Sequence, residues 1–454
     1  MKRFQTQQDL RLSELIGSLS HALDMTEGQP AGHCLRCCWI GMQIAAKLNL
    51  TATESHDLYY TLLLKDLGCS SNAARICELY LTDDRLFKRE FKETDSIASV
   101  ISFVLKHTGL QSGLAERFQR IFTVFQNGDA FAQELIQTRC QRGAEIARQL
   151  RFSEAVAEGI LSLDEHWDGN GRPEHLAGQA IPLFSRIALM AQVIDVFHSV
   201  GGPAAAIKEV RNRVGYWFDP ALVDCFFEIA LSEAFWQVLA SNDLPEMVFS
   251  MSAGQTDRPL DDDYLDDIAA AFGQVVDSKS PYTSGHSGRV ALYTDLLTQE
   301  LGLSPERRRW LKRGALLHDV GKLGVSNTIL DKPGKLTEEE WVQMRSHAQY
   351  SEEILSRISA FSELSFVAAA HHERLDGKGY PRGLTAKDIP METRVITTAD
   401  IFDAITAARP YRGAIPIPET LAMMAESVGS AIDPDCFAAL NRVVEHLAKG
   451  KSAA

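Results

Sequence analysis

The chain contains two related halves, and this internal repeat limits its fold more than any other feature. Residues 33–69 align with residues 286–322 without a gap, at a shift of 253 positions. His33 then falls on His286, and apolar residues follow each histidine at every third or fourth position. That spacing is typical of an amphipathic helix with its histidine at the start of the buried face. The sequence therefore predicts two copies of one helical unit.

A second pair of segments aligns at a smaller shift. Residues 163–173 fall on 371–381 at a shift of 208, which brings Asp-Gly-Asn-Gly-Arg-Pro onto Asp-Gly-Lys-Gly-Tyr-Pro. The drop from 253 to 208 places 45 additional residues in the first copy, around 79–137. Their pattern of apolar residues predicts additional helix at this place.

The whole chain is predicted to be all-α, with two tandem domains. Strand-type alternation is scarce, and apolar residues recur every three or four positions over long stretches such as 263–276. Turn-forming residues around 241–258 separate the two copies. We therefore expect a first domain over 1–245, a linker over 246–262 and a second domain over 263–454.

The second copy carries five histidines and two aspartates that together form a predicted metal-binding set. Imidazole nitrogens and carboxylate oxygens suit borderline divalent metals such as iron, manganese or zinc. Seven ligands are too many for one tetrahedral ion, but they fit two ions that share a carboxylate. Paired ions roughly 3.5–4 Å apart are a standard device for cleaving phosphate esters, so the set predicts a phosphate hydrolase. Its members are His286, His318, Asp319, His347, His371, His372 and Asp400.

The segments that carry these ligands resemble the HD-GYP group of the HD-domain phosphohydrolases. The resemblance covers roughly residues 264–440 and implies an all-helical domain, a centre of two or three metals, and hydrolysis of cyclic dinucleotides. Some members place a glutamate four residues before the first histidine, where it helps to hold a third metal. That position is Tyr282 in this chain, so we expect two divalent ions, iron or manganese, with zinc, nickel or magnesium as alternatives. The matching segments are PYTSGHSGR (281–289), HDVGK (318–322), ILDKPGKLT (329–337), HHERLDGKGYP (371–381), ADIFDAIT (399–406) and RPYR (409–412).

The chemistry of the ligands and the resemblance assign roles to further residues. Asp319 is expected to bridge two ions that activate a water molecule as the nucleophile. Lys322 lies three positions further along and is placed to offset charge on the scissile phosphate. The resemblance implies that the turn containing Gly379, Tyr380 and Pro381 shapes access of the substrate, and that Asp403, Arg409 and Arg412 contact it.

The first copy has lost most of the predicted ligands. Aligning 193–197 on 398–402, at a shift of 205, supplies the last of its seven positions. Protonated lysine and arginine side chains cannot donate a lone pair to a metal. We therefore expect a degenerate, metal-free copy in which Lys65 and Arg139 neutralise the retained carboxylates, with His166 as an alternative ligand. The seven positions read His33, Lys65, Asp66, Arg139, Leu163, Asp164 and Asp195.

The composition of the chain indicates which binding partners and which cellular compartment to expect. The net charge of −14 is unfavourable for long nucleic acid, whose binding depends on neutralising phosphates. No apolar run approaches the roughly 18 residues of a membrane span, and the N-terminus leads into no apolar signal core. The eight cysteines form no regular framework, as in a reducing compartment. We expect a cytoplasmic protein without membrane insertion, and both a homodimer and a signalling protein partner stay open.

Three functions remain open for such a chain. The first is a phosphodiesterase that opens cyclic di-GMP to the linear dinucleotide and onward to GMP. The second is a phosphodiesterase for 3′,3′-cyclic GMP-AMP, because an active copy behind a degenerate one resembles bacterial enzymes for that substrate. The third is a non-catalytic sensor or scaffold for cyclic dinucleotides. The intact ligand set favours an enzyme, and the resemblance places cyclic di-GMP first. Another HD branch, acting on nucleoside triphosphates or guanosine tetraphosphate, is disfavoured by the Gly-Tyr-Pro segment at 379–381.

Overall fold

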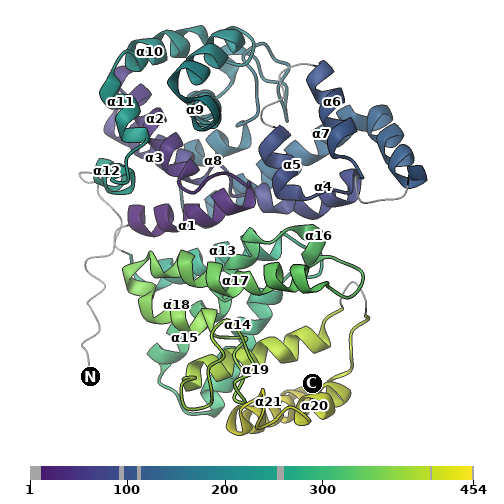
Figure 1. Ribbon diagram of the computed structural model, residues 1–454. Helices are drawn as coiled ribbons and strands as arrows, with labels where there is room; N and C mark the ends of the chain where they lie inside the picture. Colours follow the sequence, from purple (N-terminus) through teal and green to yellow (C-terminus); the bar gives the residue numbers. More distant parts are fainter. Residues whose placement is uncertain (1–11, 92–96, 110–113, 253–259, 409–411, 452–454) are drawn as a thin grey trace. The chain divides into compact units, whose positions relative to one another are not determined.

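The computed structural model describes residues 12–91, 97–109, 114–252, 260–408 and 412–451. Their secondary structure is helical, with three isolated β-bridges in place of strands, so the predicted all-α fold is confirmed (Figure 1). The chain divides into two compact units, and the division falls between Leu260 and Asp261.

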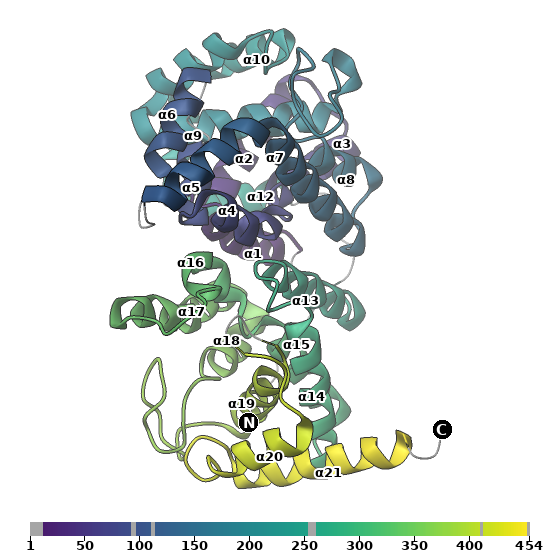
Figure 2. The same ribbon diagram turned by 90° about the vertical axis from the view of Figure 1, so that its right-hand side faces the viewer.

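The first unit consists of one helical bundle with an additional group of helices. Its core is formed where α2 packs against both α3 and α9, and α1 and α8 complete it. Figures 1 and 2 show α4, α5, α6 and the start of α7 together at one end of this unit. The elements are α1 (Leu12–Thr26), α2 (His33–Lys47), α3 (Ala52–Leu64), η2 (Cys69–Asn72), α4 (Ala73–Tyr80), α5 (Asp84–Phe91), α6 (Ile97–His107), α7 (Leu114–Gln149), α8 (Glu154–Leu161), η3 (Gly178–Ala180), α9 (Leu183–Arg213), α10 (Pro220–Ala230), α11 (Glu233–Leu239) and α12 (Leu244–Met251).

The second unit is built on the same plan. Here α14 packs against both α15 and α19, and their apolar residues share one buried core with α21. The elements are α13 (Asp262–Asp277), α14 (His286–Glu300), α15 (Pro305–Leu317), η4 (Val320–Gly324), α16 (Asn327–Leu330), α17 (Glu338–Ser356), η5 (Ser359–Phe361), α18 (Ser362–Ala369), α19 (Met391–Thr406), α20 (Ile417–Ala425) and α21 (Pro434–Lys451).

The repeat predicted from the sequence is present helix by helix. The shift of 253 carries α2 and α3 onto α14 and α15 with both ends of each helix in register. The shift of 208 does the same for α8 and α18, and it aligns the first residues of α9 and α19. The described parts of the additional region are mainly helical, as expected, and Leu79, Phe87 and Phe103 belong to a small core of their own there.

A glycine in each copy fixes how closely the helices approach the predicted site. A Cβ atom on Gly321 would lie 2.0 Å from the carbonyl oxygen of His347, and one on Gly68 would lie 1.8 Å from that of Arg139. Both distances are impossible for a real side chain, so each position requires glycine. In the second unit this contact brings η4, which follows His318 and Asp319, directly against α17.

One boundary differs from the sequence expectation. Residues 244–251, partly assigned to the linker, form α12, because Leu244 and Val248 are buried one helical turn apart against α1 and α2.

The helix α9 is long and apolar enough to span a membrane, although the sequence predicts no such segment. Of its most apolar window, 67% is buried inside the unit. The core helix of a folded unit has these same properties, so α9 is weak evidence for a span.

Candidate metal centre

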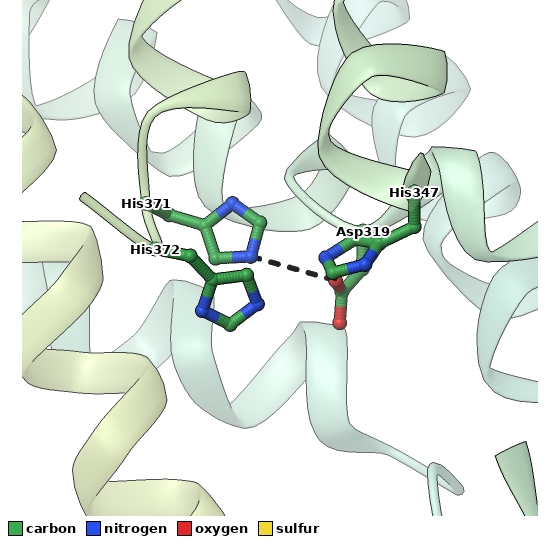
Figure 3. Close-up of side chains that lie close together, drawn as sticks. All are labelled: Asp319, His347, His371 and His372. Atoms are coloured by element: carbon green, nitrogen blue, oxygen red, sulfur yellow. Dashed lines mark ion pairs between the residues drawn. The ribbon is translucent and has the colours of Figure 1, made fainter. Parts of the chain in front are cut away.

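The seven predicted ligands come from five separate segments and converge on one point in the second unit. His286 is the first residue of α14, and His318 follows the last residue of α15. His347 lies in α17, the pair His371–His372 follows α18, and Asp400 lies in α19. The side chains are almost completely shielded from solvent, with His372 and Asp400 the most accessible. Figure 3 shows Asp319 and three of the histidines facing one another.

Asp319 lies between two groups of ligands. Its Oδ2 atom is 3.5 Å from Nε2 of His286 and 3.3 Å from Nε2 of His318. Its Oδ1 atom is 3.5 Å from Nε2 of His347 and 3.6 Å from Nε2 of His371. One carboxylate therefore offers one oxygen to each group. This is the arrangement that a carboxylate bridging two cations requires.

The backbone fixes the direction of three of the imidazole rings. Nδ1 of His318 lies 2.7 Å from the carbonyl oxygen of Ala315, three residues earlier. His347 and His371 make the corresponding contact with Met344 and Ala368, each at 2.5 Å. When Nδ1 donates its hydrogen to a carbonyl, Nε2 carries the lone pair and points toward the centre.

Five buried atoms at this centre have no hydrogen-bond partner within the described part of the chain. They are the Nε2 atoms of His286, His318, His347 and His371 and the Oδ1 atom of Asp319. Buried polar atoms in folded proteins are nearly always hydrogen-bonded, so five such atoms converging on one point need an explanation. A bound metal supplies one, because each atom is of a type that donates a lone pair to a cation.

The protonation of the histidines agrees with this assignment. Burial lowers the pKa of His347 to about 4 and that of His371 to about 3, and it holds the pKa of His372 well below its usual range. These rings are neutral at physiological pH and free to bind a metal. Burial also lowers the pKa of His286, but the hydrogen bond to Asp403 and the nearby carboxylates of Asp319 and Asp400 outweigh burial and raise it. The carboxylates therefore attract positive charge to the centre.

Lys322 lies at the edge of the centre. It belongs to η4, its ammonium group pairs with Asp319, and its side chain is 18% exposed. A substrate that enters from solvent can therefore contact the Lys322 ammonium group, which is what the predicted role of Lys322 at the scissile phosphate requires. The turn that follows the histidine pair lies beside it: a Cβ atom on Gly379 would be 2.4 Å from the backbone nitrogen of Arg374. Tight packing of this turn places the Tyr380 ring 4.8 Å from that of His372, with Pro381 next in the chain.

Asp403 does not lie where a substrate contact would. It is 1% exposed, and its carboxylate accepts hydrogen bonds from His286 Nδ1, at 2.7 Å, and from Arg289 Nε, at 2.6 Å. Both oxygens are therefore engaged within the chain, and the residue positions His286. Arg412 donates to the carbonyl oxygens of Ile405 and Ala404 at the end of α19. Arg409 lies outside the described residues.

The first unit holds an ammonium group where the second offers metal ligands. Lys65 corresponds to His318, is fully buried and forms an ion pair with Asp66. Its Nζ atom is also 3.1 Å from Nε2 of His33 and 3.2 Å from Oε1 of Gln192. Burial would lower the pKa of Lys65, but Asp66 outweighs this and keeps its pKa above the ordinary value. The cluster of His33, Cys37 and Asp195 therefore already contains a cation.

The structure corrects the alignment of Asp195 with Asp400. Asp195 accepts hydrogen bonds from His33 Nδ1, at 2.7 Å, and from Arg36 Nε, at 2.6 Å. These are the bonds that Asp403 makes in the second unit, so Asp195 corresponds to Asp403 and the shift remains 208. Gln192 then takes the place of Asp400. The sequence alignment of 193–197 at a shift of 205 was therefore wrong by three positions, or about one helical turn.

The second group of ligands is also replaced in the first unit. Arg139, at the position of His347, pairs with Asp164, at the position of His372. Leu163 is buried where the second unit has His371. His166 stacks on Trp217 with 4.1 Å between ring centroids, and burial lowers its pKa to about 4. Lys65 and Arg139 therefore pair with Asp66 and Asp164 as predicted, whereas the third carboxylate, Asp195, pairs with Arg36 instead.

Comparison with known proteins places both copies in one family. A family model for the HD domain matches residues 110–222 and 271–436. The chain is 57% identical over 437 residues to the 3′3′-cGAMP-specific phosphodiesterase 3 of Vibrio cholerae, covering 96% of this chain and 95% of that protein. It is 39% identical over 173 residues to a cyclic di-GMP phosphodiesterase response regulator of Xanthomonas campestris, covering 38% and 46%. A crystal structure of a cyclic GMP-AMP specific phosphodiesterase of V. cholerae matches with a TM-score of 0.66 and 52% identity over 96% of this chain and 98% of that one.

Proposed function

The chain belongs to the HD-domain family, and we propose that it is a metal-dependent phosphodiesterase that hydrolyses a cyclic dinucleotide. The observation that carries this proposal is the convergence of five buried lone-pair donor atoms, four from histidines and one from Asp319, that have no hydrogen-bond partner among the described residues. A sensor that only binds a dinucleotide has no need of such a set. Because the set is complete in the second copy and is replaced by residues such as Lys65 and Arg139 in the first, we assign catalysis to the second unit.

We propose that the centre holds two divalent transition-metal ions, with iron or manganese as the leading choices. His286, His318 and Asp400 would hold one ion, and His347, His371 and His372 the other, with Asp319 between them. This division follows the two groups of donor atoms that lie within 4.8 Å of one another. Two such ions, when bound, activate a water molecule and polarise the scissile phosphodiester.

The surrounding residues position the ligands and the substrate. Asp403 holds the His286 ring through Nδ1, which keeps Nε2 directed at the centre. Lys322 places a positive charge at the accessible edge, where it offsets the negative charge that builds up on the phosphate in the transition state. Water adds across one phosphorus–oxygen bond of the ring. The products are then a linear dinucleotide with a terminal phosphate and a free hydroxyl at the other end.

For the preferred substrate we propose 3′,3′-cyclic GMP-AMP, with cyclic di-GMP as the second candidate. The relative that acts on cyclic GMP-AMP aligns through both copies, over 95% of its own length. The cyclic di-GMP relative from X. campestris aligns over 46% of its length only. We therefore place cyclic GMP-AMP before cyclic di-GMP, whereas the resemblance of the motifs alone favours cyclic di-GMP. Because the two substrates differ in one base, the preference is set outside the metal centre.

We further propose that the protein works in a reducing compartment such as the cytoplasm. All eight cysteines are free thiols, and six of them are buried. Burial raises the pKa of Cys34 and Cys69, so both remain protonated thiols, each placed to donate to Asp66 at 3.6 Å. An oxidising compartment gives such a chain no disulfide framework to stabilise it.

The test is a competition between the two dinucleotides in one reaction. Manganese- or iron-loaded protein is incubated with equal concentrations of 3′,3′-cyclic GMP-AMP and cyclic di-GMP, and the loss of each is followed by chromatography. We expect both to be consumed, with cyclic GMP-AMP at least tenfold faster. Equal rates, or faster loss of cyclic di-GMP, would overturn the proposed preference. Binding of both without turnover would support a sensor and overturn the enzyme.

A further inference from the structure

Arg345 differs from the other arginines that the structure describes in the second unit. The others each have a carboxylate or carbonyl partner, but the guanidinium group of Arg345 has neither. This is unusual in a chain with 60 acidic residues and 46 lysines and arginines. The side chain is exposed, so its five N–H groups are available to a ligand from solvent.

Two aromatic rings hold this guanidinium group in place. Its Cζ atom lies 5.6 Å from the ring centroid of Trp341, one turn earlier on α17, and 5.5 Å from that of Tyr380. Cation–π contacts at such distances restrict a long side chain without using its hydrogen-bond donors. Trp341 is itself 39% exposed, which leaves part of a large aromatic surface open to solvent.

The Tyr380 ring connects this pair to the metal centre. It lies 4.8 Å from the ring of His372 and 6.3 Å from that of His347 (both histidines are labelled in Figure 3). The Tyr380 ring therefore lies between Arg345 and two of the proposed metal ligands, His347 and His372. A nucleotide base is separated from its phosphate by one sugar, so a base attached to a phosphate at the centre falls within reach of this region.

We propose that Arg345 and Trp341 form the subsite that recognises a guanine base of the substrate. The inference rests on the proposed function, because it requires a cyclic dinucleotide at the metal centre. Arginine can donate two parallel hydrogen bonds to O6 and N7 of guanine. Adenine carries an amino group in place of O6. This amino group is a donor and cannot accept a hydrogen bond from the guanidinium group, so adenine binds less well at this subsite. Trp341 supplies a face on which the base can stack, as aromatic side chains do in single-stranded nucleic acid sites.

This subsite predicts which cyclic dinucleotides are accepted. Both 3′,3′-cyclic GMP-AMP and cyclic di-GMP contain a guanine, so either can place one at Arg345. Cyclic di-AMP contains none and leaves the guanidinium group unpaired. The wild-type protein is therefore expected to hydrolyse cyclic di-AMP at least tenfold more slowly than cyclic GMP-AMP, measured as kcat/KM.

The experiment compares Arg345→Ala, Arg345→Lys and Trp341→Ala with the wild type on four substrates. These are the three dinucleotides and methyl p-nitrophenyl phosphate, a phosphodiester without a base. Arg345→Ala is expected to lower kcat/KM for cyclic GMP-AMP about ten- to hundredfold and to leave cyclic di-AMP and the nitrophenyl ester within twofold. Arg345→Lys should recover only part of the loss, because it keeps the charge but loses the paired donors. Trp341→Ala should raise KM for the dinucleotides while changing kcat less.

Arg357→Ala is the matched control. It removes another arginine at the end of the same helix, one that pairs with Glu353, and should leave all four rates unchanged. Arg345→Ala with an unchanged ratio between cyclic GMP-AMP and cyclic di-AMP would overturn the guanine subsite while the proposed function stands. A wild type that cleaves the nitrophenyl ester but no cyclic dinucleotide would overturn the proposed function itself, and this inference with it.

Discussion

Replacing Lys65 by methionine should destabilise the first unit more than almost any other single change. Methionine fills a similar volume but removes the ammonium group that pairs with Asp66. Two protonated thiols, Cys34 and Cys69, would remain near that carboxylate, each at 3.6 Å. Thiols are weak donors and carry no charge, so they replace little of the lost interaction.

The size of the effect follows from the burial of the pair. Both side chains of the Lys65–Asp66 pair are 0% exposed, so solvent does not screen it. Removing one partner of such a pair typically costs about 3–5 kcal/mol, because an uncompensated charge stays buried. For a unit of this size each kcal/mol lowers the melting temperature by about 2–4 °C, which gives a shift of about 6–20 °C. The Lys65 pKa is raised, so this contribution is fully present at neutral pH and is lost only as the pH rises through the folded-state pKa.

Thermal unfolding followed by tryptophan fluorescence is a suitable assay. Four of the six tryptophans lie in the first unit, so the signal reports mainly on it. The double variant Lys65→Met, Asp66→Asn removes both charges and should recover most of the lost stability. Lys47→Ala is the control, since Lys47 forms an exposed pair with Glu228, and should leave the melting temperature unchanged. A shift below 2 °C for Lys65→Met, or a double variant as unstable as the single one, would refute the internal counter-ion.

Three further predictions concern single side chains. Lys322→Ala should lower kcat roughly 10²–10³-fold with little change in metal content, and an unchanged kcat would remove Lys322 from the mechanism. Asp403→Ala should weaken metal binding about 10–100-fold, measured by titration with a competing chelator, because His286 loses its orienting partner. His166 has a pKa lowered to about 4, so stability should fall by up to about 3 kcal/mol as the pH drops from about 6.5 to 4. His166→Phe should flatten that dependence in urea unfolding, and an unaltered profile would exclude His166 as its source.

Much of the fold and most of the metal centre could be predicted from the sequence. The tandem pairs His318–Asp319 and His371–His372 are rare in ordinary helices, and their order along the chain specified the ligand set. The repeat predicted equivalent helices because apolar spacing reports directly on which face of a helix is buried. Burial of Lys65 followed from the same alignment, since a residue at a ligand position must face the same centre.

The remaining differences arise where side-chain direction matters more than spacing. Asp195 and Gln192 lie three positions apart on one face of α9, so sequence similarity alone could not decide which of them faces His33 Nδ1. A constant shift of 208 would have chosen correctly, because an insertion inside a helix common to both copies is improbable. The role of Asp403 was hidden for the same reason. Its hydrogen bonds to His286 and Arg289 join residues more than a hundred positions apart, and no local pattern records them.

Metal content of the full chain and of Asp319→Ala is the most direct test of the proposed two-metal centre. Both proteins are stripped with chelator, reloaded with manganese or iron, freed of excess metal and measured by elemental analysis against protein concentration. We expect about two ions per chain in the wild type and almost none in Asp319→Ala, because Lys65 and Arg139 leave the first unit without a site. A full complement of metal in Asp319→Ala would contradict this expectation.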